Sequence, residues 1–236
     1  MTSAGLQNTD PKPAMAEGSR DVRLKARKSV KGDAIMCDLS EQDHNVFLAI
    51  SFGKIHRVAA SLPEVDNINM RNHDMQTLLI HATHSTSGNL CSQLVRMLIQ
   101  ANSDINVQDV YGRTALMYAC ADRHNDDAVR HLIRQPSCDP NLVDCEGNTA
   151  LMFAVAADAV TAVHILLKHR KVRHKLNVNI ANSKGLTALD MAISLKSEEC
   201  CKVLVDQAGH KITTINDEEG LSALLGTNGM ASESSV

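Results

Sequence analysis

The frame that decides the fold is repeated in DVYGRTALMYA, residues 109–119, and DCEGNTALMFA, residues 144–154. Two further copies follow, NSKGLTALDMA from Asn182 and DEEGLSALL from Asp217. Each copy reads Asp or Asn, two residues, Gly, one residue, Thr or Ser, Ala and Leu, and the glycines are separated by 35, 38 and 35 residues. Self-similarity at this period is typical of proteins built from stacked structural repeats.

Two earlier units follow the frame less closely. The segment NHDMQTLLIHA from Asn72 has Met75 in place of Gly, and NVFLAISFGKIHRVAASL from Asn45 keeps only an Ala and a Gly. Ser40, with Asp43 three residues later, predicts the start of the first helix. We therefore expect five units, at about residues 38–70, 71–107, 108–143, 144–181 and 182–216, and a partial sixth at 217–225.

Each recurring residue of the frame has a physical role. The side chain of Asp or Asn starts a tight turn, and Gly supplies the positive φ that such a turn requires. The Thr hydroxyl accepts a hydrogen bond from a free N–H group at the start of a helix. The frame ends in a small residue that lets neighbouring helices approach closely: Ala82, Ala119, Ala154 and Ala192.

A second apolar helix is expected after each of these alanines, in LVRMLI from Leu94, AVRHLI from Ala128, AVHILL from Ala162 and CKVLV from Cys201. One helix pair cannot bury its apolar face alone, whereas stacking buries that face against the next pair. The second unit carries extra residues in HSTSGN, residues 84–89, and these are assigned to the turn between its two helices.

The frame resembles the ankyrin repeat, a unit of 33 residues with the hallmark T-P-L-H-x-A. Leu or Ala occupies the Pro position, and Ile80, Met117, Met152 and Asp190 occupy the His position, which removes the usual side-chain bonding of that His. The resemblance covers roughly three quarters of the chain. It implies an all-α solenoid of about five helix–turn–helix units with β-turn loops.

Composition agrees with this fold class and narrows the functional classes. Hydrophobic residues make up 44% of the chain but aromatic residues only 2%, so the core has to be aliphatic, as in closely packed short helices. A formal net charge of −3 indicates no domain-wide attraction for nucleic acid. Seven cysteines without a CxxC pair indicate reduced thiols in an intracellular protein, and residues 1–20 contain no apolar secretory signal.

The apolar segment at residues 150–167 contains Asp158, and a carboxylate at the centre of a membrane costs about 2.5–3.5 kcal/mol. The segment is therefore interpreted as two short helices with a turn near Asp158. The chain is expected to be soluble and not to enter a membrane.

Sequence motifs of catalysis and cofactor binding are absent: no GxG pair, P-loop, HExxH or GxSxG occurs. His81 and His84, with Cys91 beyond them, supply fewer ligands than the four that structural zinc needs, so they are interpreted as polar residues near a helix end. Cys200 and Cys201 are predicted to point to different faces of one helix, with one of them toward the core. No enzyme activity, cofactor or metal is expected.

The resemblance implies a non-catalytic monomer that binds a protein partner on the concave side of the stack, as a cytoplasmic adaptor or regulator. Two alternatives stay open: a nuclear regulator that masks or bridges a transcription or signalling factor, and an accessory, substrate-receptor subunit of an enzyme complex. Tyr111 is the expected anchor. The expected contact residues lie on turn tips and inner helices: Val110, Tyr111, Arg113, Ala121, Asp122, Cys145, Glu146, Asn148, Ala156, Ala157, Ser183, Lys184, Leu186, Ser194 and Leu195.

Both ends of the chain are expected to be flexible tails, residues 1–37 and 226–236. The basic cluster at residues 19–31 is either solvated or a nuclear import signal. The last residues, with Ser234 and Val236, match the C-terminal motif that PDZ domains bind by strand addition, so a PDZ domain is a candidate partner.

A run of cations lies in LLKHRKVRHKLNVN, residues 166–179, where one repeat is expected to join the next. Cations near a helix C-terminus gain about 0.3–1 kcal/mol from its dipole, which explains the first of them. The remaining ones, Lys171, Arg173 and Lys175, are candidate contacts for an acidic protein surface.

Overall fold

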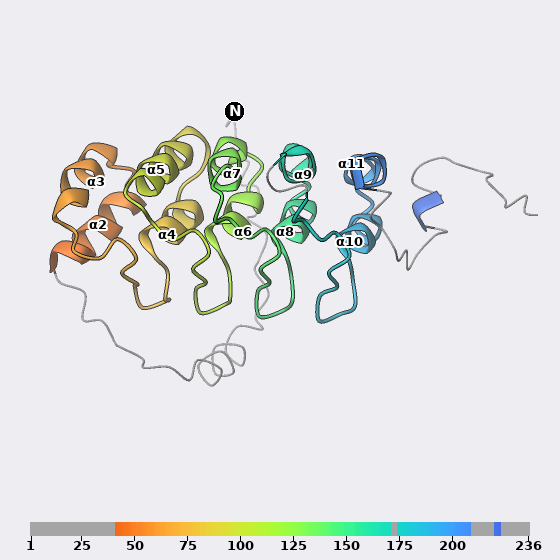
Figure 1. Cartoon of the computed structure of the whole chain (residues 1–236), viewed down its shortest axis with the longest axis horizontal. Helices are drawn as coiled ribbons and strands as arrows, with labels where there is room; N and C mark the ends of the chain where they lie inside the picture. Colours follow the sequence, from red (N-terminus) through yellow and green to blue (C-terminus); the bar gives the residue numbers. More distant parts are fainter. Residues whose placement is uncertain (1–40, 171–173, 209–219, 223–236) are drawn as a thin grey trace, which may run out of the picture. The chain divides into compact units, whose positions relative to one another are not determined.

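The computed structural model describes residues 41–170, 174–208 and 220–222. In Figure 1 the helices form two rows, with one helix of each repeat in each row. The inner helices lie on the side from which the long turns project: α2 (Glu41–Ser51), α4 (Leu78–Ser85), α6 (Ala115–Cys120), α8 (Ala150–Ala156) and α10 (Ala188–Ser194). The outer helices form the other row: α3 (Ile55–Ser61), α5 (Gly88–Gln100), α7 (Asp126–Ile133), α9 (Val160–Lys168) and α11 (Glu198–Ala208).

Every helix packs against the other helix of its repeat and against the equivalent helix of a neighbouring repeat. A short 3-10 helix, η1 (Leu62–Glu64), follows α3. Within the described residues, β pairing is limited to an isolated bridge between Val143 and Thr149. The predicted all-α solenoid of five helix–turn–helix units is confirmed.

The turns have the chemistry expected from the frame. In each turn, one side-chain oxygen accepts the backbone N–H groups two and four residues later, at 2.8–3.0 Å; these acceptors belong to Asn72, Asp109, Asp144 and Asn182. Gly112 and Gly147 have φ values of +73° and +80°, and a Cβ at either would lie 3.0 Å from the backbone of the next turn. Met75 adopts the same left-handed conformation, with φ of +59°.

Successive turns are joined by backbone hydrogen bonds. The N–H groups of Val110, Cys145 and Ser183 donate to carbonyls of the preceding turn, at 3.2, 2.9 and 2.8 Å. Since a backbone bond of this kind needs a fixed register, each turn tip is held at a defined position beside its neighbour. The loops that the sequence predicts as partner contacts are therefore ordered relative to one another.

Threonine caps the inner helices, as predicted: the hydroxyls of Thr77, Thr114, Thr149 and Thr187 each accept the N–H group three residues later, at 3.3 Å. The predicted loss of side-chain bonding at the His position of the frame is wrong for Asp190. Its carboxylate accepts the backbone N–H of Thr187 at 2.8 Å and the hydroxyl of Thr187 at 2.7 Å. An acceptor at this position thus restores a reciprocal cap.

The core is aliphatic, and the four small alanines of the frame are completely buried, which allows the close approach of the helices. The prediction that only one of Cys200 and Cys201 faces the core is wrong. Both thiols are fully buried, because α11 packs against α9 on one side and α10 on another. Burial raises the pKa of Cys201 to about 11, so this thiol stays protonated and unreactive at neutral pH.

The assignment of residues 84–89 to a turn is also wrong. Helix α4 continues to Ser85 and α5 begins at Gly88, so that the extra residues lengthen the helices and leave only two residues between them. The hydroxyl of Thr86 donates to the carbonyl of Ala82 at 2.7 Å and supports the additional turn of α4. Helix α5 is anchored at its start by a bond of 2.7 Å from the N–H of Gly88 to the side chain of Asn125.

The interpretation of residues 150–167 as two helices is confirmed, with Asp158 at φ of +50° between α8 and α9. None of the helices in the described ranges has both the length and the apolar character needed to span a bilayer. The two tails, Ser40, Lys171 and Arg173 lie outside the described residues, and so do the C-terminal Ser234 and Val236.

Candidate functional site

A row of large side chains crosses the inner helices. Each lies directly before the small alanine of its repeat, so the same face of every inner helix contributes one member: Leu48, His81, Tyr118, Phe153 and Met191. Leu48 is exposed and the other four are half-buried. We call these five residues the inner row. It runs across all five repeats beside the turn tips.

Neighbouring repeats contact one another along the inner row. The ring of Phe47 meets His81 edge-on, with 5.3 Å between the centroids, and the ring of His84 lies 4.7 Å from that of Tyr118. The hydroxyl of Tyr118 donates to Oδ2 of Asp109 at 2.7 Å. These contacts restrict the side chains; Phe47 is buried, whereas His81, His84 and Tyr118 keep part of their rings exposed.

Arg113 lies at the centre of this face. Its guanidinium carbon is 5.6, 5.9 and 5.1 Å from the ring centres of Tyr111, Tyr118 and Phe153. Its Nε lies 3.6 Å from Oδ2 of Asp144, whose side chain is only 2% exposed. One cation therefore holds a turn tip and two members of the inner row in fixed positions.

The two histidines of α4 bond to Gln76. Nδ1 of His81 lies 3.2 Å from Oε1 of Gln76, and Nδ1 of His84 lies 3.4 Å from Nε2 of the same amide. Nε2 of His81 also bonds to the hydroxyl of Ser51, at 2.8 Å. Burial lowers the pKa of both histidines below 6.5. No group of three metal-binding side chains occurs in the part of the chain that the structure describes.

The residues predicted as partner contacts lie in two places. Those of the turn tips include the exposed Cys145, Glu146, Ser183 and Lys184, while the others are half-buried: Val110, Tyr111, Arg113, Asn148 and Leu186. Those at the ends of the inner helices are exposed at Ala121, Ala156, Ser194 and Leu195 and half-buried at Asp122 and Ala157. The structure brings both groups to the borders of the inner row.

Tyr118, Phe153 and Met191 are not among the contact residues predicted from the sequence. The aligned copies nevertheless contain the signal, since TALMYA, TALMFA and TALDMA all place a large residue directly before the small alanine. The helical pattern alone does not separate a half-buried position from a buried one.

Exposed apolar side chains lie at both ends of the inner row. Phe52 follows α2 and is 70% exposed, and Leu195 follows α10 and is 53% exposed. They occupy equivalent positions, three residues after the small alanines Ala49 and Ala192. Apolar side chains at both ends extend the candidate contact surface to the first and fifth repeats.

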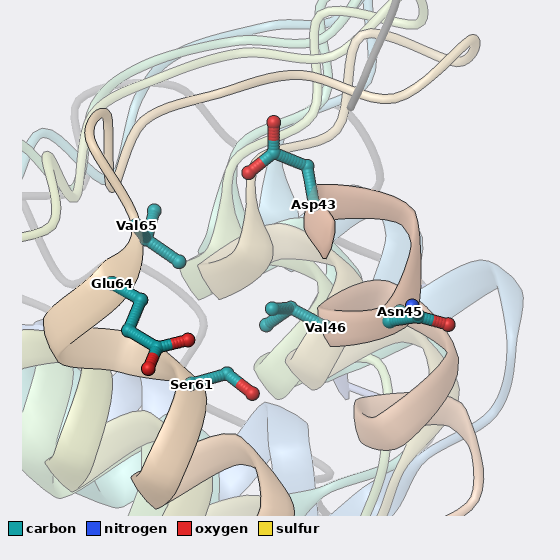
Figure 2. Close-up of a pocket in the computed structure, with 6 residues that line it drawn as sticks. All are labelled: Asp43, Asn45, Val46, Ser61, Glu64 and Val65. Atoms are coloured by element: carbon teal, nitrogen blue, oxygen red, sulfur yellow. The ribbon is translucent and has the colours of Figure 1, made fainter. Parts of the chain in front are cut away.

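A small pocket lies in the first repeat (Figure 2), lined by Asp43, Asn45, Val46, Ser61, Glu64 and Val65. In the close-up its two carboxylates come from opposite sides, one from α2 and one from η1. Its lining contains neither histidine nor cysteine, and therefore lacks the Ser–His and Cys–His pairs of acyl transfer.

A family model described as ankyrin repeats (3 copies) matches residues 46–135 and 119–216. The chain is also similar to Ankyrin repeat domain-containing protein 63 of Mus musculus, with 32% identity over 163 residues, which is 68% of this chain and 41% of that protein. The Homo sapiens protein of the same name matches with the same identity and length, over 42% of its chain. The chain thus spans about two fifths of the length of the curated relatives that it matches.

Proposed function

Because the chain belongs to the ankyrin-repeat family, we propose that it is a non-catalytic intracellular adaptor that holds a protein partner across the inner row and the adjoining turn tips. Ankyrin repeats are protein–protein interaction modules. The family assignment identifies neither the partner nor the regulatory role, so both have to be inferred from the surface of this chain.

The observation that carries the proposal is the inner row, a continuous line of half-exposed large side chains stabilised by Arg113. Interfaces draw most of their binding energy from a few aromatic and arginine side chains in ordered surroundings. Tyr118 and Phe153 are such residues, and their contacts with Arg113 reduce the rotamer entropy that binding would otherwise cost.

The cysteines support an intracellular location. The six described ones form no disulfide, and five of them are buried. Buried free thiols persist in a reducing compartment. We propose that the protein acts there as a monomer.

Affinity capture from cell extract tests the proposed surface. The inner-face variant combines Ala156→Arg with Leu195→Glu, and Tyr111→Ala tests the expected anchor separately. The control combines Ala59→Arg with Ala60→Glu on the outer helix α3. All substituted positions except Tyr111 are exposed, so folding is preserved.

Mass spectrometry of the captured proteins is expected to show at least one partner reduced about tenfold by the inner-face variant and retained by the control. Recovery of the same proteins in the same amounts with all variants would show that the partner does not bind across the inner row.

A further inference from the structure

Cations gather where the outer helices α5, α7 and α9 end. Arg96 lies near the end of α5, Arg134 directly follows α7, and Lys168 and Arg170 lie at the end of α9. Lys175 lies in the linker that follows α9. We call these five residues the basic edge.

Hydrogen bonds between the linkers bring these helix ends together. The side-chain amides of Asn106 and Asn141 donate to carbonyls of the next linker, those of Ser137 and Lys175, both at 2.7 Å. The ammonium of Lys175 donates to the carbonyl of Pro136 at 3.2 Å, and so lies beside the end of α7. Cations from three successive repeats therefore share one edge.

A groove between α5 and α7 continues the basic edge. It is lined by Asn89, Ser92, Gln93, Arg96, Asp127 and His131. The carboxylate of Asp127 is paired with Arg130 at 2.8 Å. Burial lowers the pKa of His131, Arg134 and Arg96 lower it further, and Asp127 raises it less than they lower it. With Asp127 paired to Arg130, the net charge of the groove lining comes from Arg96.

The fold does not require Arg96, Lys168 and Arg170. A cation at a helix C-terminus gains about 0.3–1 kcal/mol, but α11 of the same row has no basic residue in its last turn. Within the described part of the chain, Arg96, Lys168 and Arg170 form no ion pair. These three cations are available to a ligand.

We propose that the basic edge is a second interaction surface and binds an acidic segment of a protein partner. Carboxylates of the segment pair with the cations, and the amides of Asn89 and Gln93 in the groove bond to its backbone. The inner row and the basic edge lie on different helices, so the chain joins two proteins at once.

A protein segment fits this edge better than a membrane or a nucleic acid. The exposed large apolar residues of the described chain lie outside the outer helices, so the edge has no apolar anchor for a bilayer. The formal net charge of −3 gives the chain no domain-wide attraction for the continuous line of phosphates of a nucleic acid, whereas a short acidic segment needs only a local group of cations.

Binding of a fluorescein-labelled polyglutamate peptide of ten residues to the full-length protein tests the proposal by fluorescence anisotropy. A variant with Arg96→Glu, Lys168→Glu and Arg170→Glu is expected to bind at least about tenfold more weakly. The control carries the same change of charge at exposed positions elsewhere, Lys54→Glu, Arg57→Glu and Lys196→Glu, and is expected to bind within about twofold of the wild type. Circular dichroism establishes that both variants are folded.

An NMR titration of His131 provides a second measurement, because its pKa is expected to rise when carboxylates bind beside it. Equal weakening in both triple variants would overturn the proposal, and so would an unchanged His131 pKa in the presence of bound peptide. Tighter binding of a DNA duplex or of phosphatidylserine vesicles than of polyglutamate would assign the edge to those ligands instead.

Discussion

Nε of Arg113 lies 3.6 Å from Oδ2 of Asp144, and this pair joins the third repeat to the fourth at the base of their turns. Oδ1 of the same carboxylate accepts the N–H groups of Glu146 and Asn148. The guanidinium also lies over Phe153 of the next inner helix. Arg113 therefore supports both the Asp144 turn, which orders the turn tip of the fourth repeat, and the ring of Phe153 in the inner row.

Arg113→Ala is expected to lower the free energy of unfolding by about 2 kcal/mol, because it removes contacts with three rings and leaves the buried Asp144 carboxylate without its cation. Urea denaturation measures the change. The control is Arg130→Ala, which breaks an exposed pair with Asp127 and is expected to change stability by less than about 0.5 kcal/mol. Equal effects of the two substitutions would contradict the central role of Arg113.

Gly147→Ala is expected to destabilise the protein more than Gly185→Ala, by about 1 kcal/mol or more. Both glycines have positive φ, so that an alanine costs about 1–2 kcal/mol at either position. At Gly147 the added Cβ would lie 3.0 Å from Cα of Asn182 and 3.1 Å from N of Ser183, whereas no atom of the described residues lies within 4 Å of a Cβ at Gly185. Thermal unfolding of the two variants checks the difference, and equal midpoints would mean that the turns are not packed as described.

The turns and caps could be predicted from the sequence because their partners lie within five residues of one another. The aligned copies show the positions of the inner row but not its exposure, since the exposure of Tyr118 and Phe153 depends on Arg113 and on the packing of neighbouring repeats. The extension of α4 likewise depends on the hydroxyl of Thr86, which donates to the carbonyl of Ala82. Hydrophobic periodicity contains no information about such a side-chain bond.

The basic edge was only partly visible in the sequence. The cations around Lys175 form a linear run, but Arg96 and Arg134 come from earlier repeats and join that run only through the linker bonds of Asn106 and Asn141. The contacts between repeats bring these cations together, and the sequence of a single repeat does not predict those contacts.

Lys196→Gly is expected to stabilise the protein by about 0.5–1 kcal/mol. Lys196 follows the end of α10 with φ of +57°, a conformation that a residue with a Cβ adopts at a cost and glycine adopts freely. The side chain is exposed, so little packing is lost. Lys196→Ala keeps the Cβ and serves as the control, with no expected gain. A chemical denaturation series that ranks alanine equal to glycine would contradict the strain at this position.

Stability is expected to fall as the pH drops below about 6.5. The pKa values of His81, His84 and His131 are all lowered, chiefly by burial, so the unfolded chain binds more protons than the folded one once the pH passes below the ordinary value of 6.5. The loss ends when the pH is below the folded-state pKa values. The raised pKa of Asp126 acts in the opposite direction, because the folded chain binds this proton more tightly than the unfolded one.

A double variant with His81→Gln and His84→Gln retains hydrogen-bonding groups but no longer titrates at these positions. Its free energy of unfolding, measured in urea between pH 7.5 and pH 5, is expected to fall less steeply than that of the wild type, with a residual slope from His131. A slope identical to that of the wild type would mean that the two imidazoles of α4 are as freely solvated in the folded protein as in the unfolded chain, and would contradict the desolvation that lowers the pKa of both.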